Sequence, residues 1–229
     1  MTGLSGGDKE EILRQSAAFL GITENDLKEL TGLAVTRHFN ASEFIFWEGD
    51  SPDWFYIIAT GKVKVHKHSS LGKEFIIAFF GPGEMFGEIA VFENKPYPVS
   101  AQAMMPTTII GIKRDDMLFF MEQHPQVALR IINILGERLR DAQGRLRDLA
   151  GERVEQRLAS MLIMLSNKLG LTLPFTRQEI ADMTGTTIET AIRVMSRFKE
   201  RGIINTVRGQ VTIRDKEKLR VLSEGPPRV

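Results

Sequence analysis

The chain has 229 residues, of which 42% are hydrophobic, and a net charge of +1. This composition allows two modest domains with buried cores. The sequence contains no run of 18 apolar residues, so no membrane span is predicted. Cysteine is absent, which excludes disulfides, cysteine-ligated zinc and cysteine-ligated iron–sulfur clusters. Because Met1–Glu11 is polar and acidic, we expect no secretory signal and a cytoplasmic protein without membrane partners.

Charge is distributed unevenly along the chain. Residues Gly151–Val229 contain 14 lysines and arginines against 9 aspartates and glutamates, whereas the remainder contains 16 against 20. Such a difference is expected when one domain faces a polyanion, although a solvated basic surface would have the same composition. Charge alone therefore favours a nucleic-acid partner only slightly.

The first half of the chain combines helical spacing with many short strands. Apolar residues at helical spacing predict short helices over residues 9–34. Six apolar or alternating runs separated by turn signals then predict a sandwich or barrel. These runs are Glu43–Trp47, Trp54–Ile58, Lys62–Val65, Phe75–Phe80, Val99–Ala103 and Thr108–Ile112. We expect an α+β protein whose residues 1–123 form N-terminal helices and a jelly-roll-like β-roll.

A long helix is predicted over residues 124–150, with Pro125 in its first turn. Its apolar residues alternate in spacings of four and three, which is typical of a two-stranded coiled coil with charged flanks. A helix packed on its own domain usually has a wider apolar stripe, so we favour a homodimer. The predicted seam consists of Ile131, Leu135, Leu139, Ala142, Leu146 and Leu149. Gly151 is the expected hinge to a third segment, residues 151–229.

The third segment contains a helix-turn-helix pattern. After a helix over Val154–Leu169, Thr176–Glu179 has the composition of a capping box and opens a short helix. Gly185 suits the turn, and Thr186–Glu189 resembles a second capping box that opens a helix to about Glu200. Two short helices joined by a glycine-bearing turn predict a DNA-binding motif.

The second helix of such a motif enters the major groove. Glu189 and Arg193 lie four residues apart and so share a face, where they could accept from cytosine and donate to guanine. The structural alternative is that Glu189 completes the capping box and forms an ordinary ion pair with Arg193. Further DNA-binding candidates on this segment are Thr187, Ile188, Thr190, Arg197 and Arg177.

A β-hairpin is predicted after Gly202. Two short apolar runs flank Arg208-Gly209, which suits a two-residue turn. Arg208 at the tip of this wing is expected either to meet phosphate or to lie in a solvated turn.

Three stretches together resemble the Crp/Fnr family of regulators over nearly the whole chain. Phe46–Asp50 with Phe55–Val63 resembles the family's β-roll glycine turns, Gly83–Phe92 its effector-pocket segment, and Thr176–Gly202 its DNA-binding helices. The resemblance implies a homodimer on a palindromic operator, with RNA polymerase as a partner and an effector in the β-roll. Ile188 stands where the family's recognition helix varies, which leaves the operator sequence open.

The resemblance also makes specific demands on an effector pocket. In the cyclic-AMP binders of the family, a Gly-Glu pair similar to Gly87-Glu88 is followed by an Arg-Ser pair that holds the cyclic phosphate. Here that stretch is Tyr97–Ala101, in which Ser100 remains and the arginine is missing. A buried phosphate without a cation is costly, so we do not expect cyclic AMP.

Haem is one candidate effector, because some members of the family sense gases through it. An axial ligand would have to come from His38, His66, His68 or His124, of which His124 is the best placed, although a lone histidine is more often a capping or surface residue. An organic molecule, or a nucleotide held in another way, could equally be the effector.

A β-barrel metal enzyme of the cupin type is a competing interpretation. His66, His68 and Glu74 approach the cupin pattern, but two spacings miss by one residue. Alternate residues on a strand share a face, so His66 and His68 should lie beside Lys62 and Lys64 on a wet face. We therefore expect a solvated pair, no metal site and no enzyme.

Overall fold

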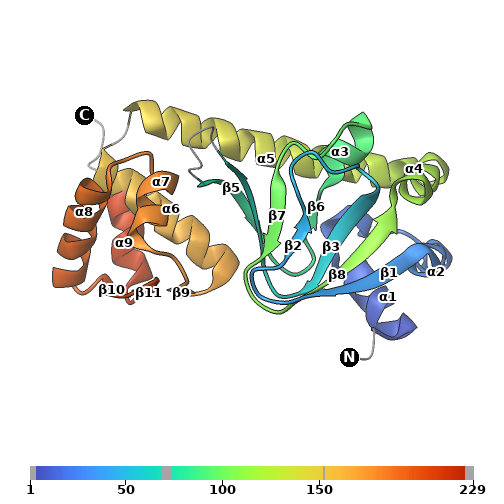
Figure 1. Ribbon diagram of the computed structural model, residues 1–229, viewed down its shortest axis with the longest axis horizontal. Helices are drawn as coiled ribbons and strands as arrows, with labels where there is room; N and C mark the ends of the chain where they lie inside the picture. The colour runs from blue at the N-terminus through green and yellow to red at the C-terminus, as the bar shows by residue number, and fades with distance from the viewer. Residues whose placement is uncertain (1–3, 69–73, 152, 225–229) are drawn as a thin grey trace. The chain divides into compact units, whose positions relative to one another are not determined.

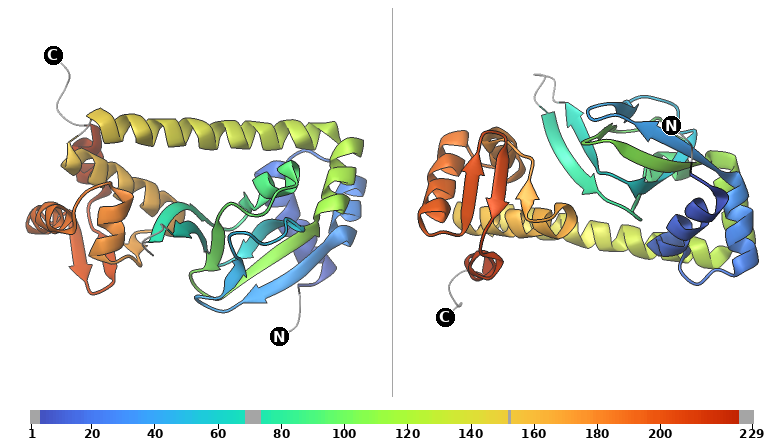
Figure 2. Two further views of the ribbon diagram at one scale, coloured as in Figure 1. Left: turned by 45° about the horizontal axis from the view of Figure 1, so that its top comes forward. Right: turned by 90° about the horizontal axis from the view of Figure 1, so that it is seen from below.

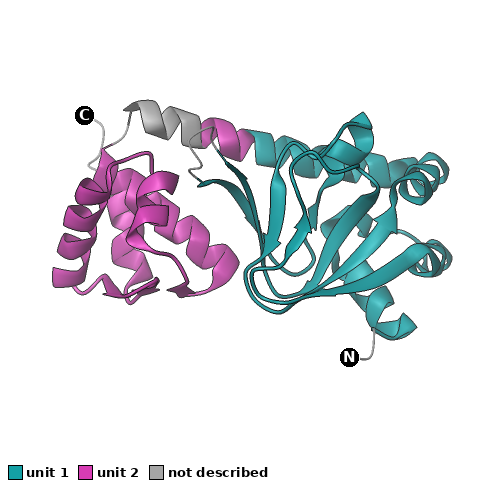
Figure 3. Ribbon diagram, viewed as in Figure 1, with its two compact units in different colours: residues 1–139 teal, residues 140–229 magenta. Residues whose placement is uncertain are grey.

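The computed structural model describes residues 4–68, 74–151 and 153–224, without the side chains of residues 145–151. The chain divides into two compact units, Met1–Leu139 and Arg140–Val229 (Figure 3). The division falls inside one long helix, α5 (Pro125–Gly151), whose bounds agree closely with the predicted helix. The three predicted domain ranges remain a prediction.

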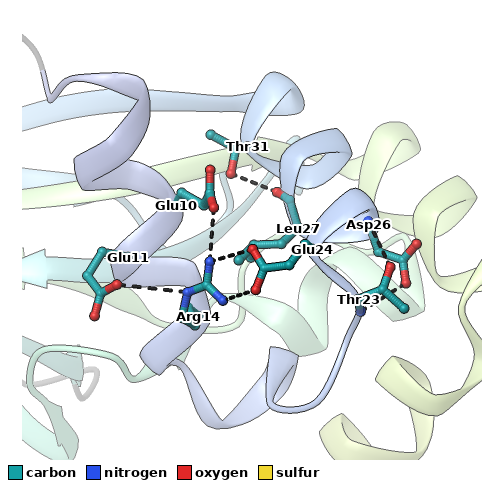
Figure 4. A network of polar contacts seen from close by, with 8 residues as sticks. All are labelled: Glu10, Glu11, Arg14, Thr23, Glu24, Asp26, Leu27 and Thr31. Atoms are coloured by element: carbon teal, nitrogen blue, oxygen red, sulfur yellow. Dashed lines mark hydrogen bonds and ion pairs between the residues drawn. The ribbon is translucent and has the colours of Figure 1, made fainter.

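Two helices precede the first strand. They are α1 (Gly6–Gln15) and α2 (Glu24–Leu33), separated by a short 3₁₀ turn. Arg14 of α1 bonds to Glu24 of α2 and also to Glu10, 2.9 Å away (Figure 4). The Thr23 hydroxyl caps α2 by accepting from the Asp26 amide. The contact between Arg14 and Glu24 joins the two helices.

Unit 1 contains two four-stranded antiparallel sheets (Figure 1). The first has the order β1-β8-β3-β6 and the second β2-β7-β4-β5. The strands are β1 (Ala34–Phe39), β2 (Phe44–Phe46), β3 (Trp54–Thr60), β4 (Val63–His68), β5 (Glu74–Phe80), β6 (Met85–Phe86), β7 (Ser100–Ala103) and β8 (Thr107–Lys113). This is the predicted fold class, an α+β protein with an N-terminal β-roll.

Strand β3 is buried on both faces, because its alternating side chains enter two different cores. Tyr56 and Ile58 belong to a core shared by strands of both sheets. Phe55 and Ile57 point to a second core, which α1, α2, α4 and α5 close from the outer face (Figure 2). The first sheet is therefore sandwiched between the second sheet and a layer of helices.

Four elements of unit 1 are absent from the sequence-based prediction. They are β1, β6, α3 (Glu88–Glu93) and α4 (Arg114–Gln123). Strand β1 was missed although all six of its residues pair with β8, because its sequence, AVTRHF, includes two basic residues. Helix α3 has only six residues and follows Gly87, whose φ is +80°.

The first half of α5 has two apolar stripes. Ile131 is only 1% exposed and lies in the core beneath the first sheet, with Leu135 packed partly buried against it. The assignment of Ile131 to a dimer seam is therefore wrong, because its own unit already covers it. Leu139, by contrast, is 59% exposed, as are Leu129 and Ile132 at 63% and 61%. Ala142 is half-buried, and the side chains of Leu146 and Leu149 lie outside the described residues.

Unit 2 contains the helices α6 (Val154–Leu169), α7 (Arg177–Met183), α8 (Ile188–Glu200) and α9 (Lys216–Glu224). A small sheet of order β10-β11-β9 lies beside them, formed by Ile204–Val207, Gln210–Ile213 and Thr172–Leu173. The bounds of α6 match the prediction, and Gly170 follows its last residue. Across the described chain, no helix is long and apolar enough to cross a membrane.

Candidate DNA-binding interface and effector site

The first helix of the motif begins with a complete capping box. The Thr176 hydroxyl accepts from the Glu179 amide at 3.2 Å, and a Glu179 carboxylate oxygen accepts from the Thr176 amide at 2.7 Å. These bonds satisfy donors that a helix start leaves unpaired. The predicted start of α7 is confirmed.

The second helix, α8, begins one residue later than the sequence pattern predicted. Its N-cap is Thr187, whose hydroxyl accepts from the Thr190 amide at 3.3 Å. Glu189 is therefore not the third helical residue, and the predicted Thr186–Glu189 capping box is wrong. The pKa of the Glu189 carboxyl is lowered by its own backbone amide and then by the Thr187 hydroxyl, so the carboxylate stays ionised at neutral pH.

Glu189 and Arg193 are both exposed on the same side of α8. Among the described residues, Arg193 has no hydrogen-bond or ion-pair partner, so the ion pair with Glu189 that the alternative interpretation required does not form. The opposite face of α8 is buried and consists of Ala191, Val194, Met195 and Phe198. Burial of that face leaves the guanidinium of Arg193 available to an external ligand.

The turn between α7 and α8 is held in place by α6. Arg157 donates through Nε to the Thr184 carbonyl at 3.2 Å and through Nη2 to the Gly185 carbonyl at 3.4 Å. Gly185 has a φ of +62°, which a side chain would disfavour. Arg157 was missed in the sequence, where it is one of many charged residues on an amphipathic helix.

The other DNA-binding candidates differ in their exposure to solvent and in whether they already have a partner within the protein. Arg197 lies 3.7 Å from Glu155 of α6, so part of its charge is already compensated. Arg177 is exposed at the start of α7, and Arg208 is exposed at the tip of the predicted hairpin, where Val207 pairs with Gln210. Ile188 and Thr190 are half-buried, and Thr187 serves as the cap.

In unit 1, the predicted effector residue Glu88 already has an internal partner. Glu88 is 4% exposed, and its carboxylate lies 2.9 Å from Nη1 of Arg138 in α5. The same guanidinium donates to the Met85 carbonyl at 2.7 Å and lies 4.7 Å from the centre of the Phe80 ring. Burial raises the pKa of Glu88, while the charge of Arg138 opposes that shift. The sequence showed Arg138 only as a charged flank of the helix.

The other two predicted pocket residues, Gly87 and Ser100, also contact residues of their own unit. A Cβ atom on Gly87 would lie 3.3 Å from the rings of both Tyr56 and Tyr97. Tyr97 stacks on Phe46 with 3.8 Å between ring centres. The Ser100 hydroxyl accepts from the Glu48 amide at 2.9 Å.

A cyclic phosphate is a poor fit to these residues. The Ser100 hydroxyl accepts from Glu48 and still has one O–H to donate, but Glu88 is an acidic side chain and the nearby guanidinium of Arg138 is already paired with it. Nothing in the segment Tyr97–Ala101 supplies the cation that the family's cyclic-AMP mode uses.

His124, the best haem-ligand candidate, ends α4 and is largely buried. Its Nδ1 lies 3.6 Å from Asp26 and its Nε2 lies 4.0 Å from Glu29. Both ring nitrogens therefore face carboxylates of α2, which suits a structural role and does not suit an axial ligand. His38 is exposed, and its Nδ1 lies 3.0 Å from the Thr108 hydroxyl.

The histidines of β4 depart from the expected wet face. His66 does share a face with Lys64 and His68, but it is only 1% exposed. The ring of Phe44, on a neighbouring segment of the sheet, lies 5.7 Å from the His66 ring and helps to cover it. The expectation of a solvated histidine pair is thus wrong for His66.

Two family models match this chain. Residues 36–124 match the model of the cyclic nucleotide-binding domain, and residues 156–222 match that of the Crp-like helix-turn-helix domain. The first covers the two sheets of unit 1, and the second covers the helices and wing of unit 2.

The chain is also similar to relatives over most of their own length. The chain is 29% identical to a CRP-like cAMP-activated global transcriptional regulator of Mycobacterium tuberculosis, covering 92% of this chain and 97% of the relative. It is 31% identical to the nitrogen fixation regulation protein FixK of Rhizobium meliloti, over 76% of this chain and 80% of that protein. The solved structure of FixK2 from Bradyrhizobium japonicum matches with a TM-score of 0.70 and 25% identity, covering 82% of this chain and 96% of that one.

Proposed function

Because this chain belongs to the Crp/Fnr family of transcription regulators, we propose that it is a homodimer that binds a palindromic operator through α8. Glu189 and Arg193 contact base edges, with the arginine donating to guanine and the carboxylate accepting from cytosine. Arg177, Thr187, Thr190 and Arg208 contact the DNA backbone or flanking bases. RNA polymerase is the expected protein partner of the DNA-bound dimer.

The free guanidinium of Arg193 is the observation that carries this proposal. It projects from a helix whose other face is fully buried and whose preceding turn is fixed by Arg157. The backbone of α8 is thus already in place, and the guanidinium has no partner among the described residues to give up on binding, which favours specific base contacts. Arg197 is a weaker candidate for base contact because Glu155 already neutralises part of its charge.

The test is operator binding by an Arg193→Ala variant. An operator is first selected from random palindromes with the unchanged protein, and affinities are then measured by gel shift. We expect the variant to lose about 1–3 kcal/mol of binding free energy, about 5- to 150-fold, and to tolerate any base at one position of each half-site.

Arg220→Ala is the matched control, because Arg220 is exposed on α9 and its replacement removes the same charge. This variant should keep full discrimination between operator sequences. An Arg193→Ala variant that retains the preference at every base position would overturn the assignment of Arg193.

We further propose that the effector acts on the contact between Glu88 and Arg138. This ion pair joins α5 to Gly83–Phe92, the segment that resembles the family's effector pocket. Helix α5 also carries the predicted dimer seam. A ligand that binds more tightly when the pair is open would shift the equilibrium between two arrangements of the protein. An organic molecule, or a nucleotide held without the phosphate arginine, is consistent with these residues.

A further inference from the structure

A cluster of possible metal ligands lies on the β4–β5 hairpin, in a region that the proposed function does not use. His66, His68 and Glu74 each direct one ligand atom toward the others, and these atoms all lie within 4.8 Å of one another. His68 and Glu74 are directly opposite in the register of the two strands. The pairing of the strands therefore brings the three side chains together.

His66 is an unusual member of such a cluster. It is 1% exposed, and neither of its ring nitrogens has a hydrogen-bond partner within the described residues. Its Nδ1 lies 3.5 Å from Oε1 of Glu74, and its ring lies 5.1 Å from that of His68. Buried polar groups are normally paired, so an unpaired imidazole directed at two further ligands points to a missing partner.

We propose that His66, His68 and Glu74 bind a divalent transition metal of the Zn²⁺ type. Two imidazoles and one carboxylate form a ligand set that zinc uses in proteins, and three protein ligands leave a fourth position for water. Magnesium and calcium prefer oxygen ligands, so the two imidazoles select against them. The bound metal would also provide the partner that His66 lacks.

Lys64 competes for the carboxylate in the metal-free protein. Its Nζ lies 2.5 Å from Oε1 of Glu74, so the metal has to displace it. Tetrahedral ligands at zinc distances are about 3.4 Å apart. Nδ1 of His66 and Oε1 of Glu74 already lie 3.5 Å apart, and no pair of the three ligand atoms is more than 4.8 Å apart, so only a small movement is needed. His68 is exposed and Glu74 is half-buried, so these two side chains have room to adjust among the described residues.

The experiment titrates the full-length, metal-free protein with Co²⁺ and then with Zn²⁺. We expect one Co²⁺ per chain, with visible absorption typical of tetrahedral nitrogen and oxygen coordination, and displacement of Co²⁺ by Zn²⁺. His66→Ala and His68→Ala should each weaken binding at least tenfold. His38→Ala is the matched control and should bind as the unchanged protein does.

A Lys64→Gln variant adds a test in the opposite direction. Removing the competing ammonium should tighten Co²⁺ binding, which a histidine cluster with a purely structural role would not do. Circular dichroism checks that each variant is folded. The proposal is overturned if the unchanged protein binds no Co²⁺, or if binding persists in the His66→Ala, His68→Ala double variant.

Discussion

A buried carboxylate needs a cation or a proton, and Glu88 has access to both. Arg138 supplies the cation at 2.9 Å, and burial has raised the pKa of the carboxyl so that a proton is bound more readily than in water. Only the ionised state holds α5 through a charged contact. Glu88 is thus the residue at which pH can affect the contact with α5.

Substitution Arg138→Met should destabilise the protein most at neutral pH. Without Arg138, an ionised Glu88 carboxylate is buried without a partner, at a cost of about 3 kcal/mol. An acid whose pKa is raised on folding adds stability below its ordinary pKa, and that stability is lost as pH rises through the raised value. The destabilisation caused by Arg138→Met should therefore shrink as the pH falls toward the ordinary pKa of a glutamate.

Urea unfolding at neutral and at mildly acidic pH measures this difference. The Arg138→Met, Glu88→Gln double variant is the control, because it has no carboxylate to leave unpaired and should recover much of the stability at neutral pH. An equal destabilisation at both pH values would mean that Arg138 acts through packing on Phe80 and not through charge.

At the scale of the element, α5 illustrates how a helix can carry two apolar faces. The inner face includes Val127 and Ile131 and completes a core of unit 1. The outer face has Leu129, Ile132 and Leu139 exposed, at spacings of three and seven residues that fit a heptad. We therefore propose this outer stripe as the dimer surface. Of the predicted seam residues, Leu139 belongs to it and Ile131 does not.

Substitution Leu139→Asp should weaken the dimer strongly, because it places a charge in the outer stripe of each subunit. We expect at least a tenfold increase in the dimer dissociation constant, measured by sedimentation equilibrium. Leu171→Asp serves as the control, since Leu171 is 54% exposed but lies in unit 2. A dimer that is unaffected by Leu139→Asp, or a protein that is already monomeric, would contradict this surface.

At the scale of the whole molecule, the uneven charge suits contact between the C-terminal segment and a polyanion. The excess of basic over acidic residues from Gly151 onward coexists with a net charge of only +1 for the full chain. Phosphate contacts release counterions from DNA, so the net charge of the protein matters less than the cations at the interface.

Operator affinity should fall steeply as salt rises. A dimer with about three phosphate contacts on each half-site should bind about 10³-fold more weakly at 200 mM than at 50 mM salt. Fluorescence anisotropy on a labelled operator measures the slope. Arg208→Ala should reduce it by about one for each subunit, because it removes one cation that we propose to face phosphate. A flat response would indicate that unit 2 recognises a protein.

The periodicity of the sequence determined much of the local structure. Capping residues and glycines located α6, α7 and the wing, because caps and turns depend on neighbours within four residues. The six predicted strands coincide with β2, β3, β4, β5, β7 and β8, since alternation and turn residues are also local signals. Strand β1 was missed because it is stabilised by pairing with the distant strand β8, which leaves no periodic signal in its own sequence. Helix α3 was missed because it is short and begins after the positive φ of Gly87, which leaves no periodic signal either.

The sequence by itself thus determined the order of domains, the exposed face of α8 and the absence of cysteine chemistry, since each follows from local spacing or composition. Only the tertiary structure decided which stripe of α5 is free, because both stripes are apolar and burial depends on the sheet packed against them. Tertiary packing also paired Arg138 with Glu88, 50 residues apart. It buried His66, although the lysines on the same face of the strand predicted that this face is solvated. These contacts join distant segments, so no local pattern could reveal them.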